Sequence, residues 1–149
     1  MRFSFSEGMT DARYYAPLAQ ACEANGYTSM TIADSLIYPQ ESDSTYPYTD
    51  TGDREFLEDK EFLETMVLVT HLAAVTTTLR FTPFVLKLPV RPPVLVAKQA
   101  ASVAYLSGNR LGLGVCHPSR RCGRCRPLCQ FGFRAFPQRG DDLADRKAD

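Results

Sequence analysis

Two sets of residues in this sequence have side chains that could do chemistry. The first is a single carboxylate, Asp34, which directly follows an apolar alternation at residues 29–33. That alternation predicts a short β-strand with Met30 and Ile32 inside. Where such strands are parallel and build a barrel, the active site lies at their C-terminal ends, so Asp34 is a candidate catalytic residue. The alternative is an aspartate that is solvated or caps the end of the strand.

The second set lies in the tail, residues 116–149, where cysteine and arginine crowd together without hydrophobic periodicity. Its soft ligands could hold a tetrahedral zinc ion, and its arginines could contact phosphates. The spacing lacks the second, distant ligand pair with which zinc ribbons and fingers clamp two chain segments. A frameshift in a GC-rich gene explains the same composition. The candidate ligands are Cys116, His117, Cys122, Cys125 and Cys129.

Composition divides the chain at the same place. Residues 1–115 hold 9 basic and 13 acidic side chains and residues 116–149 hold 8 and 4, so the net charge of zero conceals two unlike segments. The hydrophobic share of 44% and the charged share of 23% are typical of a globular protein. No apolar run suits a membrane helix or a secretory signal, which predicts a cytoplasmic protein without membrane contact.

The elements that must position these residues follow a repeating β/α pattern. Period-two alternation and apolar runs predict strands at about residues 2–6, 29–33, 79–86 and 110–115. Apolar stripes with capping and terminating residues predict helices at about residues 11–24, 60–75 and 92–106. Four strands alternating with three helices imply parallel βαβ units in an α/β fold. The 149 residues fall short of the roughly 250 of a closed (β/α)8 barrel.

A long polar connection separates the second strand from the next helix. Residues 35–59 exceed the usual loop length of about 4–6 residues, and loops of this size are often functional. We interpret this segment as a lid, in which tyrosines cover a substrate or pack on the barrel rim. Its acids favour a solvated surface over a cation site. The tyrosines are Tyr38, Tyr46 and Tyr48, and the acids include Asp43, Asp50, Asp53, Glu55, Glu58 and Asp59.

Two further signals are weaker. Gly112-x-Gly114 resembles the start of a dinucleotide-binding fingerprint, but no third glycine follows, and both glycines lie within a predicted strand. His71 is a lone histidine on a predicted helix, where a packed or surface role is more usual than ligation. Neither signal supports a Rossmann or metal site.

Four segments, taken in order, carry a family resemblance. Residues 21–27 read Ala-Cys-Glu-Ala-Asn-Gly-Tyr and precede the strand that ends at Asp34, and residues 79–86 form the third strand. The most specific match combines the stretches at residues 88–93 and 106–115, Leu-Pro-Val-Arg-Pro-Pro and Leu-Ser-Gly-Asn-Arg followed by Leu-Gly-Val. On these segments the chain resembles the N-terminal part of the luciferase-like monooxygenase superfamily, the FMN- or F420-dependent oxidoreductases.

The resemblance implies a (β/α)8 TIM-type barrel, here incomplete, with the ring of FMN or F420 at its C-terminal mouth near Asp34. It also implies a non-prolyl cis peptide at Phe84-Val85 on the third strand, and Thr82, Phe84 and Val85 as cofactor-binding residues. Pro83 stands where the family usually has a small residue. A cis Thr82-Pro83 bond and an ordinary trans strand therefore remain open.

Some F420-dependent members have a histidine directly after the acid that ends the second strand. Ser35 occupies that place here, which weakens any assignment of an imidazole proton donor. The sequence thus predicts an enzyme part at residues 1–115 and a disordered or out-of-frame tail at residues 116–149. The predicted activity is hydride transfer between a flavin-type cofactor and a small organic substrate, impaired by truncation. The alternatives are a non-enzymatic α/β domain whose zinc-binding basic tail contacts nucleic acid, and a non-functional gene remnant.

An incomplete barrel has consequences of its own. Its open parallel edges and unpartnered faces would be covered by neighbouring units in a complete barrel. We therefore expect the chain to aggregate, to stay partly folded, or to associate with a partner or a second copy of itself.

Overall fold

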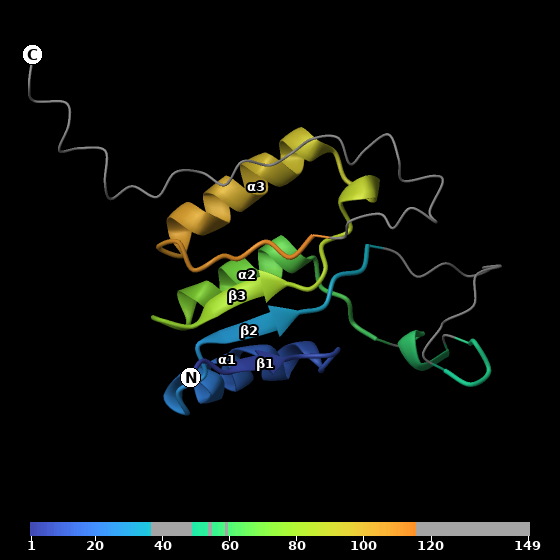
Figure 1. The fold of residues 1–149 in the computed structure, drawn as a ribbon, viewed down its shortest axis with the longest axis horizontal. Coiled ribbons are helices and arrows are strands. Elements are labelled where there is room, and N and C mark those ends of the chain that lie inside the picture. The colour runs from blue at the N-terminus through green and yellow to red at the C-terminus, as the bar shows by residue number, and fades with distance from the viewer. Residues whose placement is uncertain (37–48, 54, 59, 116–149) are drawn as a thin grey trace, which may run out of the picture. The chain divides into compact units, whose positions relative to one another are not determined.

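The computed structural model describes residues 1–36, 49–53, 55–58 and 60–115. Strands and helices alternate along these residues, as Figure 1 shows. The elements are β1 (Ser4–Ser6), α1 (Tyr15–Ala24), β2 (Ser29–Ile32), α2 (Thr65–Ala74), β3 (Arg80–Pro83) and α3 (Pro93–Leu106), with short 3-10 turns at Ala12–Tyr14, Glu55–Leu57 and Leu88–Val90.

The three strands form one parallel sheet in the order β1-β2-β3, as expected for successive β/α units. Residues Phe5, Met30 and Phe81 lie at one level across it. They belong to one hydrophobic core with residues of α1, α2 and α3, and α1 and α2 lie behind the arrows in Figure 1. The predicted inward positions Met30 and Ile32 are confirmed, since both are almost fully buried.

The other face of the sheet is polar. Because side chains alternate along a strand, the residues between the core positions point to the face opposite the helices. Their side chains are hydroxylic or cationic: Ser4, Ser6, Ser29, Thr31, Arg80 and Thr82. The described sheet therefore does not present the second apolar face that an interior dominated by Val, Ile and Leu would require.

Several exposed apolar side chains lie on α3 and on the segment that follows it. Val94, Tyr105 and Leu106 of α3 are 84%, 83% and 70% exposed, and Leu113 and Val115 are also exposed. In a complete barrel the next β/α unit would lie beside these elements. The expectation of uncovered apolar surface thus applies to this side of the described fold.

The predicted end of the first helix and both predicted ends of the third agree closely with the structure, whereas α1 begins at Tyr15, after a 3-10 turn that Asp11 caps. Asp11 accepts a hydrogen bond from the backbone N–H of Arg13 at the turn that leads into α1. The helix ends at Asn25, and Gly26 follows with a φ of 78°, a left-handed conformation that glycine adopts readily. Pro93 begins α3, where the missing N–H of proline has no cost.

The predicted start of the second helix is wrong. α2 begins at Thr65 rather than near residue 60, because the side chain of Glu64 accepts a hydrogen bond from the N–H of Val67 and caps the helix there. Phe62 and Leu63, expected on its apolar face, precede the helix. Of the remaining positions predicted for that face, Met66, Val69, Leu72 and Ala73 are buried, which confirms them. Val67 was predicted wrongly, since it is 67% exposed and Leu68 beside it is buried instead.

The predicted fourth strand forms only two isolated parallel bridges, from Leu111 to Phe81 of β3 and from Val115 to Leu86, which lies beyond the end of β3. The pairing begins well, because Phe81 N–H donates to the Arg110 carbonyl at 2.8 Å and Gly112 N–H donates to the Phe81 carbonyl at 2.7 Å. The next donor on β3 would be Pro83, which has no N–H. The pairing resumes where Leu86 N–H donates to the Gly114 carbonyl at 2.7 Å.

Arg110 connects residues 110–115 to the end of the core at which the strands begin. Its guanidinium donates to the Thr76 hydroxyl at 2.9 Å and to the carbonyls of Leu79, Ala73 and Ser107 at 3.0, 2.6 and 2.7 Å. One side chain thus satisfies carbonyl groups at the C-terminal ends of α2 and α3. Fork geometry of this kind is specific to arginine.

Glu23, near the end of α1, performs a similar task for the turn that leads into β3. Its carboxylate accepts hydrogen bonds from the N–H groups of Thr77 and Leu79 at 3.0 and 2.8 Å, and from the Thr78 hydroxyl at 2.8 Å. Burial opposes its ionisation, but these hydrogen bonds prevail and lower the pKa of Glu23 from 4.5 to about 2.

Replacing Glu23 with glutamine should destabilise the fold by about 1–2 kcal/mol at neutral pH, because the amide lacks the charge that strengthens these hydrogen bonds. A pKa lowered in the folded state stabilises the fold above the ordinary value, 4.5, and the contribution is lost as the pH falls toward about 2. Urea unfolding of both proteins across this range should show the difference disappear in acid. Glu58→Gln, at an exposed glutamate, is the control, and equal effects of the two changes would contradict the prediction.

Two sequence predictions fall outside the described residues. Tyr38, Tyr46 and Tyr48 of the predicted lid belong to residues 37–48, and the zinc ligands and arginines belong to the tail at residues 116–149. The lid, the zinc site and the boundary between two parts at residue 115 therefore stay predictions.

Candidate functional site

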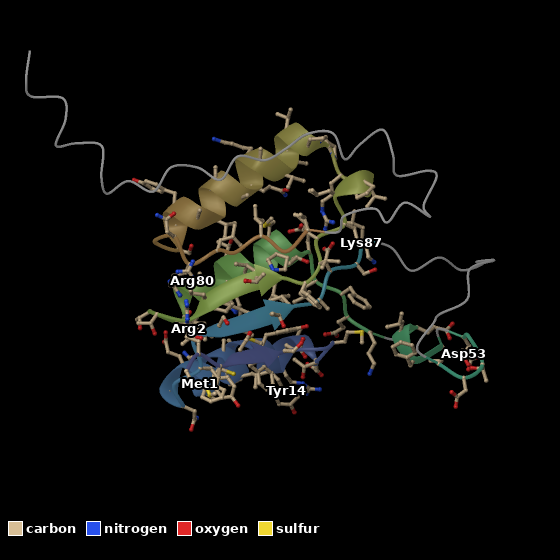
Figure 2. All side chains as sticks on the ribbon, in the orientation of Figure 1. Met1, Arg2, Tyr14, Asp53, Arg80 and Lys87 are labelled. Atoms are coloured by element: carbon tan, nitrogen blue, oxygen red, sulfur yellow. The ribbon has the colours of Figure 1, made fainter. Side chains whose placement is uncertain are left out.

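The C-terminal edge of the sheet gathers residues that follow all three strands. Glu7 comes directly after β1, Asp34 comes two residues after β2, and Phe84 comes directly after β3. Figure 2 labels Lys87 at this end, beyond the arrowheads of the strands. Parallel strands bring their carboxyl ends to one edge, and in barrels of this type that edge holds the active site.

Asp34 is fully engaged by neighbouring donors. Its Oδ1 accepts hydrogen bonds from Arg91 Nη2 at 2.6 Å and from the Thr65 hydroxyl at 2.8 Å. Its Oδ2 accepts hydrogen bonds from Arg91 Nη1 at 2.8 Å and from the backbone N–H of Lys87 at 2.9 Å. The side chains of Asp34 and Arg91 are only 1% and 7% exposed. Asp34 therefore joins the end of β2, the start of α2 and the connection between β3 and α3.

The electrostatics keep this aspartate ionised. Burial alone would raise the pKa of Asp34, but the hydrogen bonds from Arg91, from Lys87 N–H and from the Thr65 hydroxyl hold it below its usual range. A carboxylate that already accepts four hydrogen bonds is poorly suited to take up a proton. The geometry favours a positioning role for Asp34, in which it holds the Lys87 and Arg91 segment against the end of β2.

Glu7 is a second buried carboxylate at the same edge. Its two oxygens accept hydrogen bonds from the N–H groups of Met9 and Thr10 at 2.9 and 2.6 Å. Tyr15, at the start of α1, is buried beside it, and burial together with this carboxylate raises the pKa of the phenol. Glu7 therefore shapes the turn between β1 and α1 and leaves no free carboxylate oxygen there.

The end of β3 carries the predicted cofactor-binding residues. The peptide bond between Phe84 and Val85 is cis, as the family resemblance predicted, and the bond between Thr82 and Pro83 is not. Phe84 N–H donates to the Ile32 carbonyl at 2.8 Å, which holds Phe84 at the edge, where the residue is 67% exposed.

The structure does not place all three predicted residues together. Phe84 and Val85 lie at the edge, near the connection that Asp34 binds. Thr82 lies within β3 on the polar face, where it borders a separate hollow with residues from the beginnings of the strands. Of the predicted set, Asp34, Phe84 and Val85 share the C-terminal edge.

Sequence reasoning missed Arg91, Lys87 and Glu7. Arg91 lies within Leu-Pro-Val-Arg-Pro-Pro, the stretch that carried the resemblance, and a cation between apolar residues and prolines signals a buried partner. Glu7 follows the first predicted strand much as Asp34 follows the second, so the same argument from position would have found it. Lys87 gives no comparable sequence signal, because its role depends on the backbone bond to Asp34.

Two observations on the described residues narrow the class of site. No described group of three or more histidine, cysteine, aspartate or glutamate side chains is arranged to hold a metal ion. Within the same residues, no helix combines the length and the apolar character needed to cross a bilayer.

Comparison with known proteins supplies the family. The sequence pattern of the luciferase-like monooxygenases matches residues 3–119. This chain belongs to the luciferase-like monooxygenase family. Among curated relatives, the uncharacterised protein Rv0940c of Mycobacterium tuberculosis is 66% identical over 115 residues, which are 77% of this chain and 40% of the relative. The chain therefore spans less than half the length of that relative.

Solved structures confirm the fold of this luciferase-like chain. The F420-dependent tetrahydromethanopterin reductase of Methanopyrus kandleri matches with a TM-score of 0.55 and 19% identity, over 76% of this chain and 26% of that one. The oxygenating constituent of 3,6-diketocamphane monooxygenase from Pseudomonas putida, in complex with FMN, matches with a TM-score of 0.56 and 16% identity, over 80% and 30%. The described residues are the N-terminal part of a (β/α)8 barrel, as predicted, with three strands in place of four.

Proposed function

We propose that this chain forms part of the active site of an FMN- or F420-dependent oxidoreductase of the monooxygenase type. The proposed reaction passes a hydride between the ring of the cofactor and a small organic substrate. The family match over residues 3–119 is the observation that carries the proposal. The F420-dependent reductase and the FMN-bound monooxygenase of similar fold support the choice of cofactors. A cytoplasmic location belongs to the same proposal.

The residues at the C-terminal edge fit a flat aromatic ring. Phe84 offers an exposed phenyl face, and Val85 beside it is half-buried and apolar. Rings stack on or pack against such faces in offset or edge-on arrangements. Lys87 adds an exposed ammonium group, which lies 3.4 Å from the Ser35 hydroxyl. We propose that Phe84 and Val85 contact the ring and that Lys87 faces its polar rim.

The cofactor, when bound, supplies the redox chemistry, and the protein supplies position and electrostatics. The proposed task of Asp34 is indirect: with Arg91 it fixes the backbone at Lys87, and so holds the connection that carries Phe84 and Val85. Thr82 keeps its predicted part in cofactor binding as a proposal, although its place on the polar face of β3 separates it from the edge.

Fluorescence titration of the full chain with FMN and with F420 tests this proposal. We expect one of the two to bind, and Phe84→Ala to weaken that binding by about five- to tenfold, because stacking on the ring is lost. Phe3→Ala is the matched control, since Phe3 is similarly exposed, at 57%, but lies at the opposite end of the sheet. If neither cofactor binds, or if Phe84→Ala and Phe3→Ala bind alike, the proposed site is wrong.

A further inference from the structure

A hollow of about 230 Å³ opens on the polar face of the sheet, at the end where the strands begin. Figure 2 labels two of its residues, Arg2 and Arg80, at this end, opposite to Lys87. The volume is large enough for a small anion and several waters, at about 30 Å³ for each water. Its lining residues are Arg2, Phe3, Ser4, Thr28, Ser29, Arg80 and Thr82.

The strand register builds this hollow from regular structure. Ser4, Ser29 and Arg80 are direct partners across β1, β2 and β3, so their side chains form one row on the polar face. Thr28 N–H and its hydroxyl both donate to the Phe3 carbonyl, at 2.9 Å each, which fixes the rim between β1 and β2. The positions of the polar groups are therefore set by the sheet.

The two arginines lack a carboxylate among the described residues. Neither Arg2 nor Arg80 forms an ion pair or a side-chain hydrogen bond with any described residue, in contrast to Arg13, Arg91 and Arg110. Two guanidinium groups at one hollow repel each other unless an anion lies between them.

The acid that binds the turn just before Arg80 is already occupied. Glu23 accepts hydrogen bonds from Thr77, Thr78 and Leu79, the residues just before Arg80, on the side of the sheet that the helices cover. Its carboxylate is therefore held by the backbone of that turn. The described lining of the hollow combines two guanidinium groups with the hydroxyl groups of serine and threonine, and it includes no carboxylate.

From these observations we propose a second binding site, for a small divalent oxyanion of the phosphate type, on the polar face of the sheet. Arg2 and Arg80 bind the anion through their guanidinium N–H groups, and the Ser4 and Ser29 hydroxyls donate to its remaining oxygens. Guanidinium forks match the oxygens of phosphate-like anions in geometry and charge. The site lies at the other end of the strands from Phe84 and Val85, and Thr82 is the one proposed cofactor-binding residue that also lines this hollow.

Isothermal titration of the full chain with inorganic phosphate, against sodium chloride of equal ionic strength, tests the site. We expect phosphate to bind with a stoichiometry near one, and Arg80→Gln to weaken binding by about tenfold. Arg2→Gln should weaken it as well, and Arg80→Lys should lie between the wild type and Arg80→Gln, because it keeps the charge but loses the fork.

Arg13→Gln is the matched control, because Arg13 is an exposed arginine paired with Asp11 on another part of the surface. Its phosphate binding should equal that of the wild type. The circular dichroism spectra of all variants should coincide, which excludes unfolding as the cause of any loss. Phosphate binding that is absent, that matches chloride, or that falls equally in Arg13→Gln and Arg80→Gln would overturn the proposal.

Discussion

Replacing Asp34 with asparagine is expected to lower the free energy of unfolding by about 3–5 kcal/mol, the largest effect of any single change considered for this chain. The substitution leaves the Arg91 guanidinium buried without its main counter-charge. Glu64 lies 3.8 Å from Arg91 and is one third exposed, so it compensates only in part. The loss is a large fraction of the typical stability of a domain.

The chain contains a matched comparison for this prediction. Arg13 and Asp11 form an ion pair with the same 2.6 Å separation as Arg91 and Asp34, but their side chains are 73% and 38% exposed. Arg13→Gln should therefore leave the urea midpoint unchanged, because water screens the exposed pair. The double change Asp34→Asn with Arg91→Gln should recover part of the loss, since it removes both buried charges. Equal midpoints for Asp34→Asn and Arg13→Gln would contradict the argument.

If Asp34→Asn prevents folding altogether, Thr65→Val tests the same hydrogen bonds with a smaller expected loss of stability. It removes the hydroxyl that donates to Asp34 at 2.8 Å and keeps the volume of a fully buried side chain. We expect a loss of about 1–2 kcal/mol. A variant as stable as the wild type would show that the hydrogen bonds at Asp34 do not hold the edge together.

The sign of the pH dependence follows from the same contacts. The pKa of Asp34 is lower in the folded protein than its usual value of 3.8. The stabilisation is therefore complete above that value and is lost as the pH falls through the folded pKa. The difference in stability between the wild type and Asp34→Asn should narrow in acid. A constant difference across this range would mean that the charge of Asp34 is not what stabilises the edge.

The sequence predicted those parts of the fold that are determined by residues close together in the chain. Strand β2 and the C-terminal end of α1 were predictable, because apolar alternation and the pair Asn25-Gly26 act within a few residues. The start of α2 was not, since the acids and apolar residues near 60–64 resemble a helical first turn, and the cap at Glu64 competes with it. The interrupted pairing after β3 depends on one missing N–H, at Pro83, and on where residues 110–115 lie in space.

The candidate site also has parts that the sequence predicted and parts that it could not predict. Position after a strand was enough to predict that Asp34 lies at the C-terminal edge, and the family resemblance was enough to predict the cis peptide at Phe84-Val85. The partner of Asp34 could not be read from spacing, because Arg91 is 57 residues away and reaches it only through the parallel arrangement of β2 and β3. The polar face was likewise hidden, since the sequence shows alternation but not which face the helices leave uncovered.

Gly114→Ala is the second large effect that we expect, a loss of about 1–3 kcal/mol. A Cβ at this position would overlap the carbonyl oxygen of Pro83, which is backbone and cannot rotate away. The segment must then move off β3, and the hydrogen bond from Leu86 N–H to the Gly114 carbonyl should break. Hydrogen exchange at the Leu86 amide should therefore accelerate more than at the Phe81 amide, whose acceptor is Arg110.

Gly112 tests whether the close approach of residues 110–115 to β3 is the cause of the expected loss of stability. A Cβ there would lie 2.5 Å from the Thr82 hydroxyl oxygen, which is a side-chain atom. Gly112→Ala should therefore destabilise the fold, and adding Thr82→Ala should restore much of the loss. No second substitution can rescue Gly114→Ala in this way, because its obstacle belongs to the backbone of Pro83.

Gly8→Ala is the control, because a Cβ at Gly8 meets no atom within 4 Å. If Gly8→Ala and Gly114→Ala are equally stable, the glycines are not required for the approach of the two segments. If Gly114→Ala accelerates hydrogen exchange at the Leu86 amide and Gly8→Ala does not, then Gly112-x-Gly114 has a packing role. The pair that resembles a nucleotide-binding fingerprint would then be explained by a segment that must lie close to β3 at the point where Pro83 interrupts the hydrogen bonds.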